Sequence, residues 1–151
     1  MWKARSRSLE YALSLVRRIH DGPYVFCYPY NSIADLDLAS LGISAAGFET
    51  PTSDGLVMFN VVDQALDLYR LKSWAVRERH FDAIVYQLSQ HQPNDSWTIL
   101  AFHSLDGEGH EPWTSERFSR LVAAVRAMGC QIVTVGDMVS RLSRHSAECR
   151  P

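Results

Sequence analysis

Stretches with helical spacing alternate along this chain with short stretches rich in β-branched and aromatic residues, and this alternation constrains the fold most. Over 7–20 the apolar residues recur every three or four positions, which predicts an amphipathic helix. The stretch 25–28, which ends at Pro29, predicts a buried strand. Over 77–90 the helical spacing returns, which predicts a second long helix.

The same patterns predict the remaining elements, in this order: a short helix near 35–41, a strand over 45–49, an irregular region over 50–76 with a strand near 68–71, a strand over 97–102, a helix between Thr114 and Gly129, a strand over 131–135 and a last helix over 137–143. Alternating helices and strands favour a parallel sheet with helices packed on it. We expect an α/β half-barrel, with one domain over 1–143 and a flexible tail over 144–151.

The helix after Trp113 has the clearest boundaries in the sequence. Thr114 is a residue type that caps helices, because its hydroxyl can accept a hydrogen bond from a backbone N–H of the first turn. Trp113 and Phe118 have the spacing of a hydrophobic staple around such a cap. Gly129 is suited to end the helix.

Composition excludes several classes of function. The chain has 151 residues, and its 15 Lys and Arg against 17 Asp and Glu give a net charge of −2. No basic excess points to nucleic acid, and no apolar run approaches the roughly 18 residues of a membrane span. Three cysteines, an odd number without a CxxC pair, are typical of free thiols in a reducing compartment. No signal peptide is visible, so the default expectation is a cytoplasmic protein.

Three places are candidates for chemistry. The segment 28–31 (Tyr-Pro-Tyr-Asn) follows a predicted strand, where a proline turn can direct the Tyr30 backbone N–H at a ligand or simply form a rigid corner. His103 ends an apolar strand and is either a general acid or base, or a hydrogen-bonded core histidine. Arg70 lies in an apolar stretch, where an arginine generally needs an anionic partner or a ligand.

The loop over 106–111 holds Asp106, Glu108, His110 and Glu111 between glycines. Oxygen and imidazole side chains in a short segment can bind a metal ion, but the spacing is not that of an EF-hand. Glycines between acids are also typical of a solvated loop, so we assign no metal ligands. The other four histidines receive no role: His20, His80, His91 and His145.

Together these segments resemble the second half of a NodB-type polysaccharide deacetylase domain (carbohydrate esterase family four). The similar segments are 26–31 (Phe-Cys-Tyr-Pro-Tyr-Asn), 42–48, 68–71 (Leu-Tyr-Arg-Leu), 99–103 (Ile-Leu-Ala-Phe-His) and 118–135, within about residues 8–142. The resemblance implies a distorted (β/α) barrel that lacks its first strands, and metal-dependent hydrolysis of N-acetyl groups on amino-sugar polymers.

The resemblance also implies roles for three residues. The Tyr30 backbone N–H would help to form the oxyanion hole, and His103 would protonate the leaving amine. Asn31 stands where the family has glycine, and Cys27 stands where many members carry arginine. Arg70 lies in a segment like that of members without this arginine, which implies that it supplies the guanidinium group.

The metal-binding half of the family's site is missing from this sequence. The family's first half carries an Asp-Asp pair and a His-x-x-x-His pair, and neither occurs here. A hydrolytic metal site needs about three protein ligands and a bound water. We therefore expect no cofactor in this chain, a zinc-like divalent metal only in the complete family domain, and an inactive C-terminal part that results from truncation, a misplaced start or degeneration.

A second hypothesis is a non-catalytic module that binds carbohydrate or another protein on the same scaffold. Tyr28, Trp74 and Trp113 are its candidate sugar-stacking rings, although such aromatics also occur in hydrophobic cores. The expected partner is a polysaccharide or amino-sugar oligomer. An exposed sheet edge is also a candidate homodimer interface.

The resemblance makes one geometric prediction. We expect Tyr30, Arg70 and His103 to lie at or just beyond the carboxyl ends of three strands. In a parallel sheet those ends share one rim, so the three residues should converge there. Without an active site, His103 would instead bond to a core carbonyl and Arg70 would extend to solvent.

Overall fold

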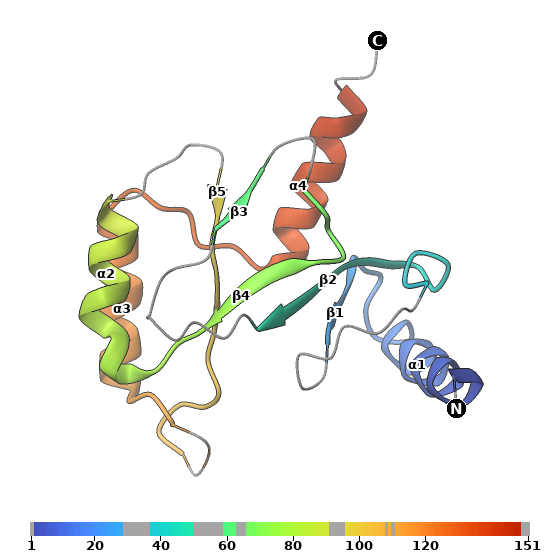
Figure 1. Cartoon of the computed structure of the whole chain (residues 1–151), viewed down its shortest axis with the longest axis horizontal. Helices are drawn as coiled ribbons and strands as arrows, with labels where there is room; N and C mark the ends of the chain where they lie inside the picture. Colours follow the sequence, from blue (N-terminus) through green and yellow to red (C-terminus); the bar gives the residue numbers. More distant parts are fainter. Residues whose placement is uncertain are drawn as a thin grey trace.

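A four-stranded parallel sheet organises the computed structural model, which describes residues 2–28, 37–49, 59–62, 66–90, 96–107, 109 and 111–148. Its strands are β1 (Tyr24–Cys27), β2 (Ile43–Glu49), β4 (Leu71–Ala75) and β6 (Ile99–Ala101), in the order β1-β2-β4-β6. Each neighbouring pair is parallel. The prediction of an α/β fold with a parallel, curled half-barrel sheet is thus confirmed at this level (Figure 1).

Four α-helices surround this sheet within the described part of the chain: α1 (Trp2–Val16), α2 (Phe81–Gln90), α3 (Ser115–Ala127) and α4 (Val135–Glu148). A short 3-10 helix, η2 (Glu78–His80), leads into α2. In Figure 1, α2 and α3 lie together at one side of the sheet, α4 lies beyond β4, and α1 lies near the β1 end.

The two faces of the sheet bury different residues, as the alternation of side chains along a strand requires. Trp74 of β4 and Leu100 of β6 pack with α2 and α3 in one core cluster. Leu71 and Ile99, which lie on the opposite face of the same two strands, pack with Val139 of α4 in a second core cluster. The sheet is therefore covered by helices on both faces, as parallel sheets generally are.

A small antiparallel sheet lies beside the main one and depends on a single amide side chain. It pairs β3 (Asn60–Val61) with β5 (Ser96–Trp97). The Nδ2 of Asn60 donates to the carbonyl of Lys72 at 2.9 Å and to that of Trp97 at 3.2 Å, while its Oδ1 accepts the Lys72 N–H at 2.9 Å. Asn60 is only 4 % exposed, so this amide supplies hydrogen bonds that a neighbouring strand would otherwise provide.

Helix α3 confirms its predicted boundaries. The Thr114 hydroxyl accepts the backbone N–H of Arg117 at 3.3 Å, as a capping residue does. Trp113 and Phe118 both pack in the core cluster beneath the helix. Gly129, just after the helix, has a φ of 80°, a conformation that glycine adopts at low cost.

Several expected elements differ from the structure. Within the predicted helix near 35–41, the described residues from 37 form turns that end at Gly42, whose φ is 73°. The stretch 68–70 is a turn, and β4 begins only at Leu71. The apolar stretch over 97–102 is divided at Thr98, because β5 and β6 belong to different sheets.

The segment 131–134 was predicted as a strand and forms none. Instead, the following helix α4 begins at Val135, earlier than expected, because the Thr134 hydroxyl accepts the backbone N–H of Asp137 at 3.1 Å and so caps it. Helix α4 also continues beyond the predicted 137–143, to Glu148.

Candidate functional site

Polar residues follow the carboxyl ends of β4 and β6. Ala75 and Ala101 are the last paired residues, and Val76 adds a backbone hydrogen bond to Ala101 at 3.0 Å. Arg77 and His103 each follow their strand by two residues. Because the strands are parallel, both residues leave the sheet at the same rim, where ligand sites of α/β folds are usually found.

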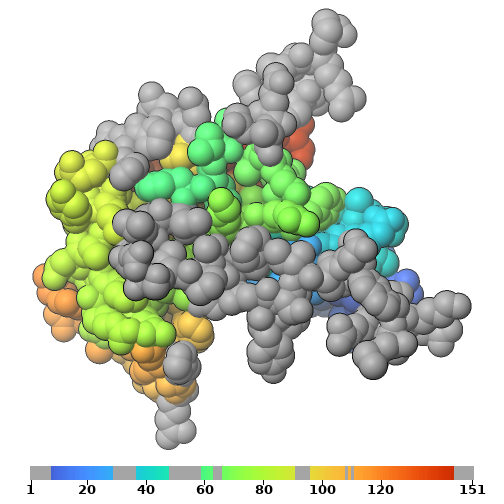
Figure 2. All heavy atoms as spheres, in the orientation of Figure 1, coloured from blue at the N-terminus to red at the C-terminus, as the bar shows by residue number. Residues whose placement is uncertain are grey.

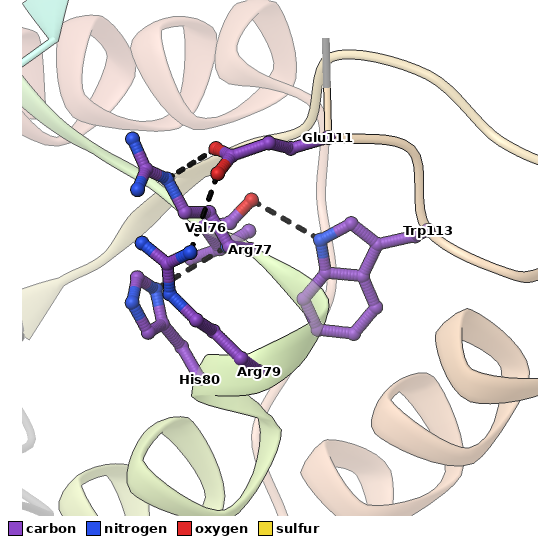
Figure 3. Close-up of polar contacts among 6 residues, drawn as sticks. All are labelled: Val76, Arg77, Arg79, His80, Glu111 and Trp113. Carbon is purple, nitrogen blue, oxygen red and sulfur yellow. Dashed lines mark hydrogen bonds and ion pairs between the residues drawn. The ribbon is translucent and has the colours of Figure 1, made fainter. Parts of the chain in front are cut away.

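Four residues at this rim, which we call the rim cluster, are Arg77, Arg79, His80 and Glu111. The Glu111 carboxylate forms ion pairs with Arg77 and with Arg79, the latter at 3.3 Å (Figure 3). Its side chain is 29 % exposed, and its backbone φ is 51°, which is uncommon for a residue with a side chain. One half-buried carboxylate thus holds two guanidinium groups at the end of β4.

His80 faces the same cluster from η2. Its ring stacks on Trp74, with centroids 5.9 Å apart and planes 14° apart. Its Nδ1 accepts the backbone N–H of Arg77 at 3.3 Å, so the neutral tautomer carries its proton on Nε2.

The surroundings of His80 favour this neutral form. Burial lowers the pKa of the imidazole below its ordinary value of 6.5, and the guanidinium groups of Arg79 and Arg77 lower it further. The negative charge of Glu111 raises the pKa of His80, but by less than the other effects lower it. His80 is therefore a neutral ring at physiological pH, able to donate from Nε2.

The loop that follows β6 returns to the sheet at Trp113. The backbone N–H of Trp113 donates to the Ser104 carbonyl at 3.0 Å, and its carbonyl accepts the Asp106 N–H at 2.9 Å. The Trp113 indole Nε1 also donates to the carbonyl of Val76 at 3.1 Å (Figure 3). These bonds fix the loop against the residue that follows β4.

Acidic side chains hold the first turn of α3. Glu78 accepts the N–H and the hydroxyl of Thr114 at 3.2 and 3.1 Å, and lies 3.7 Å from Arg117. Asp106 accepts the Ser115 N–H at 2.6 Å and also the Ser115 hydroxyl. These two hydrogen bonds lower the pKa of the Asp106 carboxyl. In Figure 2, the orange residues of α3 lie next to α2 at the lower left.

The predicted convergence of catalytic residues is not observed for Arg70. It lies in the turn before Leu71, hence at the amino end of β4, whereas His103 lies beyond the carboxyl end of the parallel strand β6. The Arg70 side chain is 66 % exposed and lies 3.7 Å from Asp67. The predicted strand-end position of Arg70 is therefore wrong, because the turn occupies the residues expected to be strand. His103 itself is exposed, two residues beyond β6.

The remaining predicted site residues divide into two groups. Tyr30 lies outside the described residues, as do Glu108 and His110 of the loop considered for a metal. Tyr28, Trp74 and Trp113 are 5, 1 and 0 % exposed, so their rings are part of the core and not of the surface. The Tyr28 hydroxyl donates to the Tyr69 carbonyl at 3.2 Å, and burial raises its pKa.

The described residues do not fit a metal ion. Nowhere among them do three or more His, Cys, Asp or Glu side chains come together as a metal site requires. Glu111, the most central acid of the rim, is instead paired with guanidinium groups. We therefore derive no chemical step that uses a metal.

None of the sequence patterns described above predicts the rim cluster. They assign no role to His80 and do not group Arg77, Arg79 and Glu111. A signal was present, because the segment 77–80 (Arg-Glu-Arg-His) places three basic side chains directly before the apolar pattern of α2. Glu111 carries no comparable signal, since its pairing depends on the return of a loop.

The fold and the site define a mixed α/β protein with polar residues gathered at the carboxyl end of a parallel sheet. Comparisons with protein-family models, with curated proteins and with solved structures find no match to this chain. Among the residues that the structure describes, no helix is long and apolar enough to cross a membrane.

Proposed function

We propose that the chain is the C-terminal part of a NodB-type polysaccharide deacetylase domain, with His103 as its general acid. The observation that supports this most is the position of His103, exposed just beyond the carboxyl end of β6. The order of the four parallel strands, which follows the chain, is also what the second half of a distorted (β/α) barrel requires.

In the complete domain, which would supply the nucleophilic water, His103 would lie near the amide nitrogen of an N-acetylated amino sugar and give a proton to the leaving amine. The Tyr30 backbone N–H would stabilise the oxyanion, as the resemblance implies. The sequence has no Asp-Asp and no His-x-x-x-His pair to hold a metal and its nucleophilic water. The 151-residue chain should therefore bind the substrate class without hydrolysing it.

Binding can be tested with a hexamer of N-acetylglucosamine and a chain labelled with isotopes at its histidines. We expect the ring signals of His103 to shift in a saturable way. His20 is an exposed histidine that precedes β1, on the amino side of the parallel strands, whereas His103 follows β6, and His20 should not respond. Replacement of His103 by Gln should remove the responding signal and weaken binding, while His20→Gln should not.

Release of acetate from the same hexamer is the second measurement. No release is expected, with or without added zinc. Acetate release that a chelator abolishes would overturn the claim that the metal-binding half is missing. No saturable shift at His103 would overturn the proposed site.

The alternative of a sugar-binding module is less well supported. Its three candidate rings are Tyr28, Trp74 and Trp113, and all three are buried. A ring stacks on a sugar only where one of its faces is accessible. Hexamer binding that responds to Trp113 substitution in a folded variant, and not to His103→Gln, would favour this alternative.

A further inference from the structure

A cavity of about 830 Å³ is lined by residues of α3 and α4, and the four residues of the rim cluster do not line it. Its volume is within the roughly 300–1,000 Å³ that small-molecule sites usually have. Apolar side chains from α3, α4, β6 and the segment after Gly129 form most of its wall, including Val122, Val125, Met138, Leu142 and Ile99.

The segment 131–134, which does not pair as a strand, borders this cavity. The segment joins α3 to α4 and lines the cavity on one side. Within the described chain, Cys130, Ile132 and Val133 take part in no backbone-to-backbone hydrogen bond. Ile132 is 51 % exposed, so the apolar surface of the cavity continues to its opening.

Of the described residues that line the cavity, only Arg141 carries a permanent charge, and this exposed side chain lies at the opening of the cavity. The Arg141 Nη1 donates to the Gln131 Oε1 at 2.7 Å. No ion pair joins it to a carboxylate of the described residues. A guanidinium group has five N–H donors in a planar fork, so Arg141 retains donors that match a carboxylate.

We propose that this cavity binds a small anionic amphiphile, specifically a monocarboxylate with a hydrocarbon chain. The chain occupies the apolar space between α3 and α4, and the carboxylate pairs with Arg141. Gln131, which accepts a hydrogen bond from Arg141, provides a second polar group at the opening of the cavity. This site is separate from the rim cluster and does not depend on the proposed deacetylase function.

Titration with octanoate, decanoate and dodecanoate, below their micelle concentrations, tests the hydrocarbon part. Trp97 lines the cavity, so its fluorescence reports binding. Burial of each CH₂ group is worth a factor of about four in affinity, so each pair of added carbons should lower Kd by a factor on the order of ten. Affinity that does not depend on chain length would overturn the proposal.

Substitution of Arg141 tests the carboxylate part. A charge-assisted hydrogen bond is worth a factor of about ten or more, so Arg141→Gln should raise the Kd of dodecanoate at least about tenfold. Arg144 is exposed on the same helix and does not line the cavity, so Arg144→Gln is the matched control. Both variants alter exposed side chains and should unfold at the wild-type temperature.

Two further results would overturn the proposal. Equal loss in Arg141→Gln and Arg144→Gln would show adsorption to a basic helix surface. Absence of saturable dodecanoate binding to the wild-type chain would show that the segment 131–134 closes the space in solution. Dodecyltrimethylammonium, which has the same tail and a positive head group, should bind more weakly than dodecanoate.

Discussion

The indole of Trp113 donates its Nε1 hydrogen to the carbonyl of Val76 at 3.1 Å, and this bond joins the loop after β6 to the end of β4. Trp113 is fully buried, so the bond lies in the core. Trp74, which is equally buried, has an indole nitrogen without a hydrogen-bond partner among the described atoms. The two tryptophans therefore form a matched pair for measuring what this hydrogen bond contributes.

Trp113→Phe should destabilise the protein more than Trp74→Phe does. Both substitutions remove similar volume, but only the first leaves a buried carbonyl unpaired, at a cost of about 1–3 kcal/mol. Urea unfolding of the two variants, followed by circular dichroism, measures the difference. Equal losses of the free energy of unfolding would mean that the Val76 carbonyl finds another donor.

His80 should make stability depend on pH in the weakly acidic range. Burial, Arg79 and Arg77 lower its pKa in the folded protein below 6.5. The unfolded chain therefore binds a proton more readily, and stability present above pH 6.5 is lost as the pH falls toward the folded pKa. In His80→Gln the free energy of unfolding should fall less between about pH 7.5 and about pH 5.

The control for this titration is His20→Gln, because His20 is exposed and lies outside the rim cluster. The pH profile of His80→Gln should differ from that of the wild-type protein more than the profile of His20→Gln does. A profile of His80→Gln that matches the wild type would contradict the assignment of the neutral ring.

Asn60→Asp should be strongly destabilising at neutral pH. The new oxygen would face the carbonyls of Lys72 and Trp97, which both accept from the amide Nδ2 in the native protein. An uncompensated buried charge of this kind costs on the order of 3–5 kcal/mol. Part of this loss should be recovered in acid relative to the wild type, because a protonated carboxyl has a donor. Asn60→Ala lacks a titrating group and should show no such recovery.

Thr114→Ala should lower the free energy of unfolding by about 0.5–2 kcal/mol, the usual effect of removing a helix cap. The substitution removes the acceptor for the Arg117 N–H and the hydroxyl that donates to Glu78. Thr114→Ser keeps both and should restore most of the stability. Thermal unfolding measures all three proteins, and a Ser variant no better than Ala would contradict a capping role.

The sequence was most informative where the determinants are local. The cap at Thr114, the glycine at position 129 and the spacing of apolar residues act within a few positions, and α3 forms as they predict. Strand β1 also begins and ends within one residue of its prediction. The parallel arrangement followed from the alternation of elements, which depends only on the order of these local patterns.

The sequence was least informative where the local structure depends on residues far away in the sequence. The apolar stretch 131–134 has strand-like composition, but a strand also needs a neighbouring strand to pair with. In the structure 131–134 pairs with no described strand. Asn60 has no local pattern that indicates its three hydrogen bonds to Lys72 and Trp97. The position of Arg70 also depended on where β4 begins, and a shift of a few residues moved it to the opposite end of the strand.

The order of the parallel strands has a consequence for how the protein is made. Each new strand of the parallel sheet pairs with the parallel strand synthesised before it, across connections of 15, 21 and 23 residues, which are inexpensive to close. On a ribosome, β1, β2 and β4 can therefore assemble before Trp113 and α3 have emerged. Until then the core cluster that contains Trp74 lacks Trp113 and Leu121, so apolar surface of β4 stays exposed at this stage of synthesis.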